Sequence, residues 1–143
     1  MKVIFLCTAN SCRSQMAEAW AGKLFPEDWQ VSSAGLLTYR ITKKTRAVMA
    51  EVGLDMAGQQ TKTLDNFNLD DFDRVVTLSH EVGTYLPELA DPARHLACPI
   101  EDPMSATGDP EEVRAAFRLG RERVRRIVQR LVDGTLVSGY AGD

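Results

Sequence analysis

A cysteine and an arginine with five residues between them, Cys7 and Arg13, are the side chains of this sequence best suited to chemistry. The apolar run 3–6 before the cysteine predicts a short buried strand. After the arginine, apolar residues recur at helical spacing through residues 14–24, which predicts an amphipathic helix. A thiol at the end of a strand and a guanidinium at the start of a helix are groups that a tetrahedral oxyanion needs. Residues 7–13 therefore predict an anion-binding loop that contains a nucleophile.

Helix geometry explains why such a loop binds anions. The first backbone amides of a helix have no partner within it, and the helix dipole favours negative charge at that end. The same field favours the Cys7 thiolate over the thiol, and Arg13 carries a planar set of donors that grips two oxygens at once. The Ser14 hydroxyl is placed to donate to the Cys7 sulfur, and Asn10 tolerates the left-handed backbone of a tight loop. The predicted oxyanion-binding residues are Thr8, Ala9, Asn10, Ser11, Cys12, Arg13 and Ser14.

Composition limits the classes to which the protein belongs. With 143 residues, 44% of them hydrophobic, and a net charge of −3, the chain is expected to form one domain and not to bind nucleic acid nonspecifically. The opening apolar run is too short for a signal or membrane segment, so we expect a cytoplasmic protein. We also expect a monomer. In a reducing compartment, three cysteines are reactive or buried thiols rather than a disulfide framework. His80 and His95 have no further ligand at metal-binding spacing, so no metal site is expected.

Apolar runs typical of strands alternate along the chain with helical patterns. The alternation predicts a single α/β domain over residues 1–134, with a four-stranded parallel sheet, helices on both faces and the oxyanion loop after the first strand. Ligands of such folds bind at the carboxyl ends of the strands, where Cys7 lies. The small and polar residues 135–143 predict a flexible tail. The expected strands are 3–6, 30–34, 74–78 and 95–98, and the expected helices are 14–24, 43–52, 80–86 and 110–133.

A nucleophile that attacks an oxyanion needs a proton donor for the oxygen that leaves. Asp102 lies just past the fourth predicted strand, in a loop that contains Pro99 and Gly108, and so at the same edge of the sheet as Cys7. We therefore predict that it is the general acid. The alternative is that Asp102 and Pro103 form a turn with no catalytic role.

The segment CTANSCRSQMAEAW resembles the signature of the low-molecular-weight protein tyrosine phosphatase superfamily, and in particular of its arsenate reductase branch. The resemblance extends to SSAG at 32–35, DRVVTLS at 73–79 and EDP at 101–103, and so covers most of the chain. It implies the fold of that superfamily, with Cys7 as nucleophile and the aspartate of EDP as general acid. Ala9 stands where many relatives have glycine. If that position needs a positive φ, alanine costs on the order of 1 kcal/mol.

Two activities follow from this resemblance. Phosphatases of the family carry aromatic residues directly after the Asp-Pro pair to flank a phosphotyrosine ring, whereas here Met104 and small or polar residues follow. Arsenate, as small as phosphate, needs only the loop. We therefore expect an arsenate reductase that uses Cys7 to reduce arsenate to arsenite with thiol reducing equivalents. One alternative is a phosphatase for phosphotyrosine or small phosphomonoesters, and another is a non-catalytic oxyanion-binding or redox-sensing protein that uses Cys7 and Cys12.

Reduction needs a source of two electrons, and here the sequence differs from the thioredoxin-linked reductases. Those relatives pass a disulfide to further cysteines, the first of which follows VVTL, where this chain has Ser79. After Cys7 attacks arsenate, the second thiol is either Cys98 or an external thiol such as glutathione, followed by a glutaredoxin-like protein. Cys98 is equally well explained as a core residue, and thioredoxin alone is expected to support little turnover. By resemblance, Cys12 matches a loop cysteine that forms a protective disulfide with the nucleophile.

A cation site and a basic helix face are the remaining predictions. In relatives, the residues that match Asn10, Glu18 and Ser33 help to form a cation site beneath the loop. Lys62 lies near an acidic ligand of some of them, so its ammonium group is a candidate replacement for a monovalent cation. The last predicted helix carries seven arginines. We interpret them as a solvated face paired with acidic neighbours, with docking of an acidic redox partner as the alternative.

Overall fold

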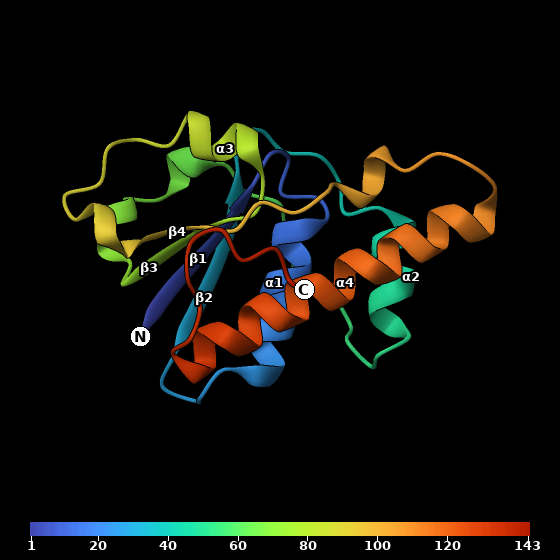
Figure 1. Cartoon of the computed structure of the whole chain (residues 1–143), viewed down its shortest axis with the longest axis horizontal. Coiled ribbons are helices and arrows are strands. Elements are labelled where there is room, and N and C mark those ends of the chain that lie inside the picture. Colours follow the sequence, from blue (N-terminus) through green and yellow to red (C-terminus); the bar gives the residue numbers. More distant parts are fainter.

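A four-stranded sheet forms the centre of the protein in a computed structural model that describes residues 1–143 (Figure 1). The strands are β1 (Lys2–Cys7), β2 (Gln30–Gly35), β3 (Arg74–Thr77) and β4 (His95–Ala97). They lie in the order β2-β1-β3-β4, so β1 is a central strand, and it is almost entirely buried. All pairings are parallel, which confirms the predicted four-stranded parallel sheet.

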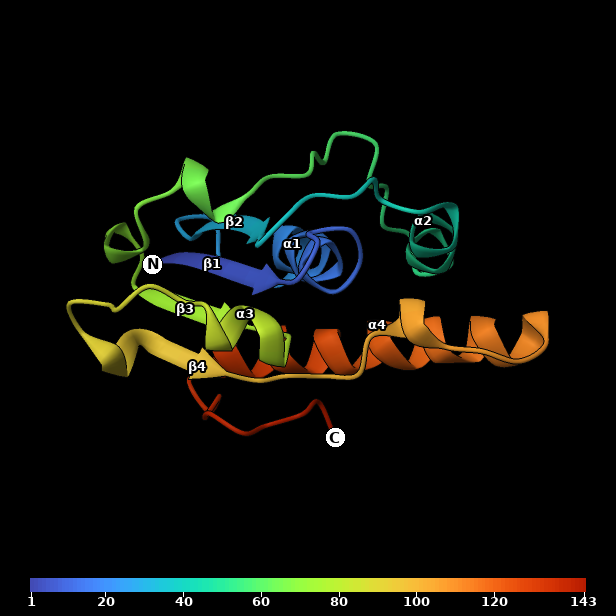
Figure 2. The ribbon, with the colours of Figure 1, turned by 90° about the horizontal axis from the view of Figure 1, so that it is seen from above.

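Helices cover both faces of the sheet, as predicted, but they cover them unequally (Figure 2). On one face α1 packs against β1 and β2, α4 packs against α1, and α2 packs against α4. These helices enclose the larger apolar cluster, which includes Phe5, Met16 and Phe117. The other face is covered by α3 and two 3₁₀ turns around a smaller cluster that includes Leu6 and Phe72. The helices are α1 (Arg13–Leu24), α2 (Lys43–Ala50), α3 (His80–Thr84) and α4 (Pro110–Asp133), and the turns are η1 (Leu64–Asn66) and η2 (Leu69–Asp71).

The parallel register brings the carboxyl ends of the strands to one edge of the sheet. Cys7 ends β1 beside the last residue of β2. The Leu78 amide donates to the Leu6 carbonyl at 2.7 Å, and the Cys98 amide donates to the Thr77 carbonyl at 2.8 Å. The segments that follow β3 and β4 therefore leave the sheet on the same side as the loop after Cys7.

Helix α4 begins and ends at the residues that the sequence indicates. Asp109 accepts from the Glu112 amide at 2.9 Å, and the Glu112 side chain accepts in return from the Asp109 amide at 3.4 Å. Gly134 ends the helix with a φ of 75°. No helix, α4 included, has both the length and the apolar composition that crossing a membrane requires.

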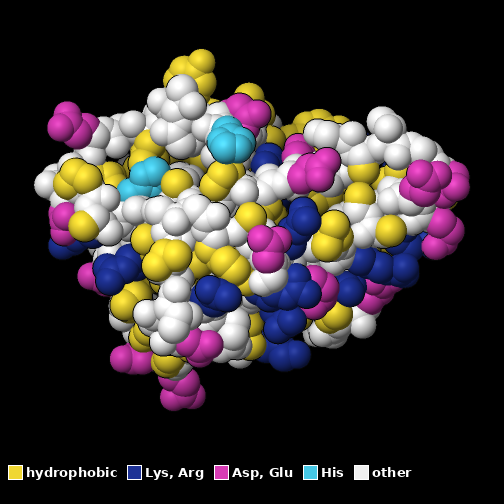
Figure 3. All heavy atoms as spheres, in the orientation of Figure 1, with side chains coloured by type: hydrophobic (Ala, Val, Ile, Leu, Met, Phe, Trp, Pro, Cys, Tyr) yellow, Lys and Arg dark blue, Asp and Glu magenta, His cyan; other side chains and the backbone are white.

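Four of the seven arginines of α4, Arg114, Arg118, Arg121 and Arg125, form ion pairs within the molecule, as predicted for a solvated face. Arg118 and Arg121 both bind Glu51 at the end of α2, and Arg125 pairs with Glu122. Hydrogen bonds from the two guanidinium groups lower the pKa of Glu51 to about 2. Basic and acidic side chains lie interspersed where α4 crosses the face seen in Figure 3. Arg118 and Arg121 therefore tie α2 to α4.

Residues 135–143, whose composition predicts a flexible tail, pack against β4 and α4. Leu136 belongs to the larger apolar cluster. The Ala97 amide donates to Ser138 Oγ at 3.1 Å, and the Gly139 amide donates to the Ala97 carbonyl at 2.7 Å. The tail thus covers the outer edge of β4, where backbone groups would otherwise lack partners. No periodic pattern in this segment predicts these contacts, which come from one apolar side chain, one hydroxyl and the backbone.

Candidate active site

The loop after β1, residues 7–13, is shaped by a buried asparagine. Asn10 has a φ of 49° and is the only non-glycine residue with a left-handed backbone, which agrees with the prediction for it. Its side-chain oxygen accepts from Gln15 Nε2 at 2.9 Å and from the Lys62 amide at 2.8 Å. Ala9 does not adopt a positive φ, so it carries no conformational cost relative to glycine.

Cys7 lies at the base of this loop with its sulfur 2.8 Å from Ser14 Oγ, the contact that the spacing predicts. Ser14 Oγ also accepts from Asn10 Nδ2 at 2.8 Å, which leaves the serine proton free to point at the sulfur. Asn10 Nδ2 also donates to Ser33 Oγ at 3.0 Å. Asn10 and Ser14 are fully buried, so their side chains support the loop from behind and do not line the cavity in front of it.

The first turn of α1 presents backbone amides that no side chain caps. Cys12 is the N-cap residue, but its side chain accepts no hydrogen bond from the helix, and the first turn contains no acidic residue. The amides that a side-chain cap would satisfy are therefore available to an anion.

Arg13 is almost fully buried and connects the loop to the neighbouring strand ends. Its Nη1 donates to the Leu78 carbonyl at 3.3 Å and to the Ile100 carbonyl at 3.0 Å, while Nη2 lies 3.6 Å from Asp102 Oδ2. Arg13 Nε is the one buried side-chain nitrogen or oxygen without a hydrogen-bond partner. Buried polar groups are normally satisfied, and an oxyanion bound in the loop would supply the acceptor that this donor lacks.

Asp102 meets Cys7 and Arg13 at a cavity of about 250 Å³. Its side chain is 35% exposed, and Oδ1 accepts from the Met104 amide at 3.0 Å. The aspartate thus caps a 3₁₀ turn, as a turn dipeptide does, and also lies at the cavity, as a general acid must. The cavity is lined by Cys7, Thr8, Ala9, Ser11, Cys12, Arg13, Leu37, Tyr39, Asp102 and Met104.

Leu37 and Tyr39 also line the cavity, although no motif in the sequence points to them. They follow β2, and their amides donate to two carbonyls of the loop at 3.2 and 3.0 Å. Gly35 allows this close approach, because a Cβ there would lie 2.7 Å from the Asn10 nitrogen. Gly35, in the SSAG element, is therefore the residue of the sequence that could indicate this close approach of the two segments. An exposed aromatic ring, that of Tyr39, borders the cavity even though none follows Asp102.

The two other cysteines differ in their access to Cys7. Cys12 lines the same cavity, and burial raises its pKa to about 12 even though the Thr45 hydroxyl lowers it. Cys98 is fully buried in the apolar cluster, with its sulfur 3.7 Å from the Val137 carbonyl, and burial raises its pKa to about 11. Both side chains are therefore neutral thiols at physiological pH.

Ser79, the position that the resemblance aligns with a relay cysteine, caps α3 beside the loop. Its Oγ accepts from the Val82 amide at 3.3 Å and from Thr8 Oγ1 at 3.1 Å. Thr8 Oγ1 also lies 3.3 Å from Glu81 Oε2, a contact that the sequence does not predict. The position is thus close to the loop, but it carries a hydroxyl instead of a thiol.

The residues predicted for a cation site lie together beneath the loop. Ser33 Oγ donates to Glu18 Oε1 at 3.0 Å, and the Lys62 ammonium lies 3.7 Å from the same oxygen. Lys62 Nζ also donates to the Gln60 carbonyl at 2.5 Å. The positive charge beside Glu18 is therefore the ammonium group of Lys62. No three His, Cys, Asp or Glu side chains gather closely enough to hold a metal ion.

Proteins related in sequence include arsenate reductases. The chain matches the family described as low molecular weight phosphotyrosine protein phosphatase over residues 2–135. An arsenate reductase of Halalkalibacterium halodurans is 35% identical over 127 residues, which cover 89% of this chain and 91% of that protein. An arsenate reductase of Bacillus subtilis is 35% identical over 122 residues, which cover 85% of this chain and 88% of that protein.

Solved structures of similar proteins share the whole fold. An arsenate reductase in an oxidized state superposes with a TM-score of 0.80 at 35% identity, and one in a phosphate-binding state with 0.76 at 33%; each match covers 94% of this chain and 98% of the other. A low molecular weight protein tyrosine phosphatase from T. tengcongensis, 22% identical, has the same fold with a TM-score of 0.76, over 94% of this chain and 99% of its own. The family match, the relatives and the fold together show that this chain belongs to the low-molecular-weight phosphotyrosine protein phosphatase family, as its sequence motifs predict.

Proposed function

We propose that this protein is an arsenate reductase in which Cys7 is the nucleophile, Arg13 and the loop amides bind the oxyanion, and Asp102 is the general acid. The observation that carries the proposal is the 2.8 Å contact between Cys7 Sγ and Ser14 Oγ beside an uncapped helix N-terminus, at a cavity that Arg13 and Asp102 also line. A cavity of about 250 Å³ suits a small tetrahedral anion. The arsenate reductases at 35% identity support arsenate as that anion.

The reaction has two stages. First, the Cys7 thiolate attacks arsenate while Arg13 and the amides hold its negative oxygens, and Asp102 gives a proton to the oxygen that leaves as water. Second, another thiolate attacks Cys7 Sγ. The S–As bond then breaks with its electron pair left on arsenic, so that arsenite leaves and a mixed disulfide remains. A further thiol reduces this disulfide and restores Cys7.

In this proposal the second thiol comes from outside the chain. Cys98 is fully buried, and its sulfur faces the Val137 carbonyl, outside the cavity that Cys7 lines. Cys12 does line the cavity, but its pKa of about 12 keeps it protonated, and the thiolate is the attacking form. Ser79 has no sulfur to offer. A small thiol with a glutaredoxin-like protein therefore accounts for the second stage better than an internal relay does.

Turnover of arsenate with different reductants tests this proposal. We expect NADPH oxidation with glutathione, glutaredoxin and glutathione reductase, and little with thioredoxin and its reductase, because Ser79 interrupts the usual relay. The Cys98→Ser variant should keep the wild-type rate, since that thiol packs in the core. If Cys98→Ser instead stopped after a single attack by Cys7, Cys98 would be the resolving thiol. Failure of the wild type to consume arsenate with any thiol would contradict the reductase.

Tyr39 favours a second candidate function, hydrolysis of an aryl phosphate. Its exposed ring borders the cavity and is available to a substrate ring. The family description itself names phosphotyrosine. Because this single aromatic lies on only one of the segments around the cavity, we expect weak hydrolysis of p-nitrophenyl phosphate. Rapid hydrolysis without thiol-dependent arsenate consumption would make the phosphatase the principal activity.

Replacement of Asp102 with asparagine should slow the first chemical step by about a hundredfold, because an amide cannot supply the proton. The turn should persist, since an asparagine oxygen can still accept from the Met104 amide. Rapid-mixing measurements should show a smaller loss with p-nitrophenyl phosphate, whose leaving group departs without protonation. Phosphate affinity serves as the control and should not change. Equal losses with activated and unactivated leaving groups would argue against leaving-group protonation.

We further propose that the Lys62 ammonium takes the place of a monovalent cation beneath the loop. Its position 3.7 Å from Glu18 Oε1 supports this role. Every group in the proposed mechanism apart from the external thiol comes from one chain, which fits a monomer. The need for a reduced small thiol fits a cytoplasmic location.

A further inference from the structure

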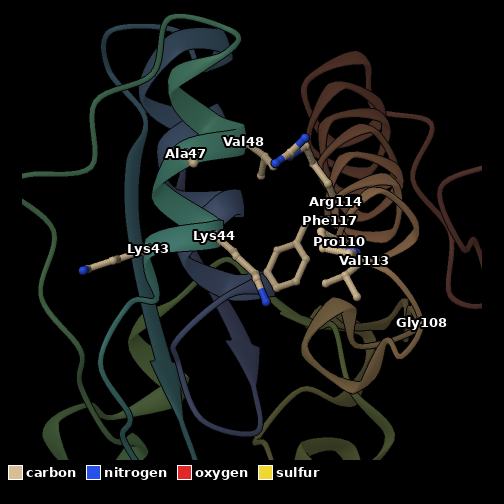
Figure 4. Close-up of a pocket in the computed structure, with 9 residues that line it drawn as sticks. All are labelled: Lys43, Lys44, Ala47, Val48, Gly108, Pro110, Val113, Arg114 and Phe117. Atoms are coloured by element: carbon tan, nitrogen blue, oxygen red, sulfur yellow. The ribbon is translucent and has the colours of Figure 1, made fainter.

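A second cavity lies between the first turns of α2 and α4 (Figure 4). Its volume is about 450 Å³, against about 250 Å³ at the active site, and falls in the range of roughly 300–1,000 Å³ typical of pockets for organic ligands. Phe117 and Val48, both buried, give it an apolar floor. In Figure 4, Lys44 and Arg114 point from opposite helices toward the space around Phe117, whereas Lys43 points away.

Part of the positive charge at this cavity has no ion-pair partner within the fold. Arg114 is paired with Glu111, but Lys44 forms no ion pair. Lys43 and Lys44 open α2, whose first turn contains no acidic residue. Cations in the first turn of a helix oppose its dipole, so these lysines do not stabilise α2. Departures from local rules of this kind concentrate at functional sites. An unpaired cation beside an apolar floor fits an organic anion.

Two segments of the chain connect this cavity to the active site. Tyr39 and Met104 line the active-site cavity, and Lys43 and Gly108, each four residues further along, line the second cavity. Four residues span at most about 14 Å. The two cavities are therefore neighbours along these segments, close enough for one small molecule to extend from the second cavity toward the first.

We propose that this cavity binds the carboxylate-bearing part of the small thiol that resolves the Cys7 adduct, an inference that rests on the proposed reductase function. Lys44 holds the carboxylate, the apolar floor holds the body of the molecule, and the thiolate sulfur reaches Cys7 Sγ. An S–S bond forms, the S–As bond breaks, and arsenic(V) leaves as arsenite(III). A second molecule of the thiol then displaces Cys7. Two thiols are thus oxidised to one disulfide, and their two protons leave with one arsenate oxygen as water.

Binding of S-methylglutathione, which has both carboxylates of glutathione but no free thiol, tests the site apart from turnover. We expect calorimetry to detect binding to the wild type and about tenfold weaker binding to Lys44→Glu, the scale of one charge-assisted contact. Lys43→Glu is the matched control, because it makes the same charge change on a side chain that points away from the cavity. Both variants place an acid in the first turn of α2, so neither should lower the melting temperature.

Steady-state kinetics should show the same contrast. Lys44→Glu should raise the KM for glutathione about tenfold, but not the KM for glutathione diethyl ester, whose carboxylates are masked. Equal effects of the two variants, or equal KM values for glutathione and its diester in the wild type, would overturn the proposal. So would an effect of Lys44→Glu seen only with glutaredoxin, which would indicate a protein partner. If no thiol supported arsenate consumption, the reductase function would fail, and absence of S-methylglutathione binding would separately overturn the thiol site.

Discussion

Replacing Cys7 with serine should abolish turnover of arsenate and of aryl phosphates, with a loss on the order of 10⁶-fold, as expected when a covalent nucleophile is removed. The hydroxyl stays protonated at neutral pH. Phosphate should still bind, because the loop amides and Arg13 are unchanged. In the wild type, Ser14 Oγ lies 2.8 Å from Cys7 Sγ, and the oxygen of a serine at position 7 can keep this contact. Arsenite production and p-nitrophenyl phosphate hydrolysis measure the turnover, and calorimetric titration with phosphate measures the binding.

Cys12→Ser is the matched control for this prediction. It makes the same sulfur-to-oxygen exchange within the same loop, on a thiol that stays neutral because its pKa is about 12. This variant should therefore retain multiple turnover. More than trace activity in Cys7→Ser would mean that the nucleophile lies elsewhere, and loss of phosphate binding would mean that the serine distorts the loop.

Replacing Arg13 with lysine should lower kcat/KM by about 10²–10³-fold, the scale of losing a preorganised oxyanion donor. The guanidinium reaches the Leu78 and Ile100 carbonyls through Nη1 and still leaves Nε without a partner for an anion oxygen. A lysine ammonium is a single point of charge and cannot meet these demands together. Phosphate affinity should fall with the rate, which calorimetry and single-turnover kinetics measure side by side.

Arg118→Lys is the control outside the active site, because Arg118 lies on the surface of α4 and pairs with Glu51 at the end of α2. That variant should keep normal activity. Arg13 also joins the segments that follow β3 and β4, through the Leu78 and Ile100 carbonyls. Thermal unfolding of both variants therefore shows whether a loss of stability accompanies the loss of anion binding. Normal activity in Arg13→Lys would exclude the guanidinium from a role in oxyanion binding.

The sequence predicts elements best where several local signals agree. Helix α4 is the clearest case, since the Asp109 cap, a helical apolar stripe and the Gly134 stop all specify it, and the structure contains each of them. Strands β1 and β3 are predicted almost as well, because both are mainly buried apolar runs. Strand order is different, because no local pattern states which strands pair. The 3₁₀ turns η1 and η2 are too short to produce a periodic signal.

The candidate site shows the same difference between features set by local sequence and features set by long-range packing. Cys7 and Arg13 belong to one loop, so their spacing alone predicts that they act together. Asp102 is far away in sequence, and its place at the cavity follows from the parallel topology. Tyr39 could not be predicted in this way. Its segment is brought to the loop by backbone hydrogen bonds, which leave no mark on side-chain identity except at Gly35, where a Cβ would clash.

The small volume of the active-site cavity determines where selectivity between anions must arise in the proposed reductase. Uncapped amides and a guanidinium around about 250 Å³ recognise a shape and charge that arsenate shares with phosphate and sulfate. Phosphate therefore competes for the loop, and the flux of arsenate depends on the ratio of the two anions. Discrimination comes after binding, because arsenic keeps the electron pair of the broken S–As bond and is reduced, whereas a phosphocysteine is not reduced and is released by hydrolysis.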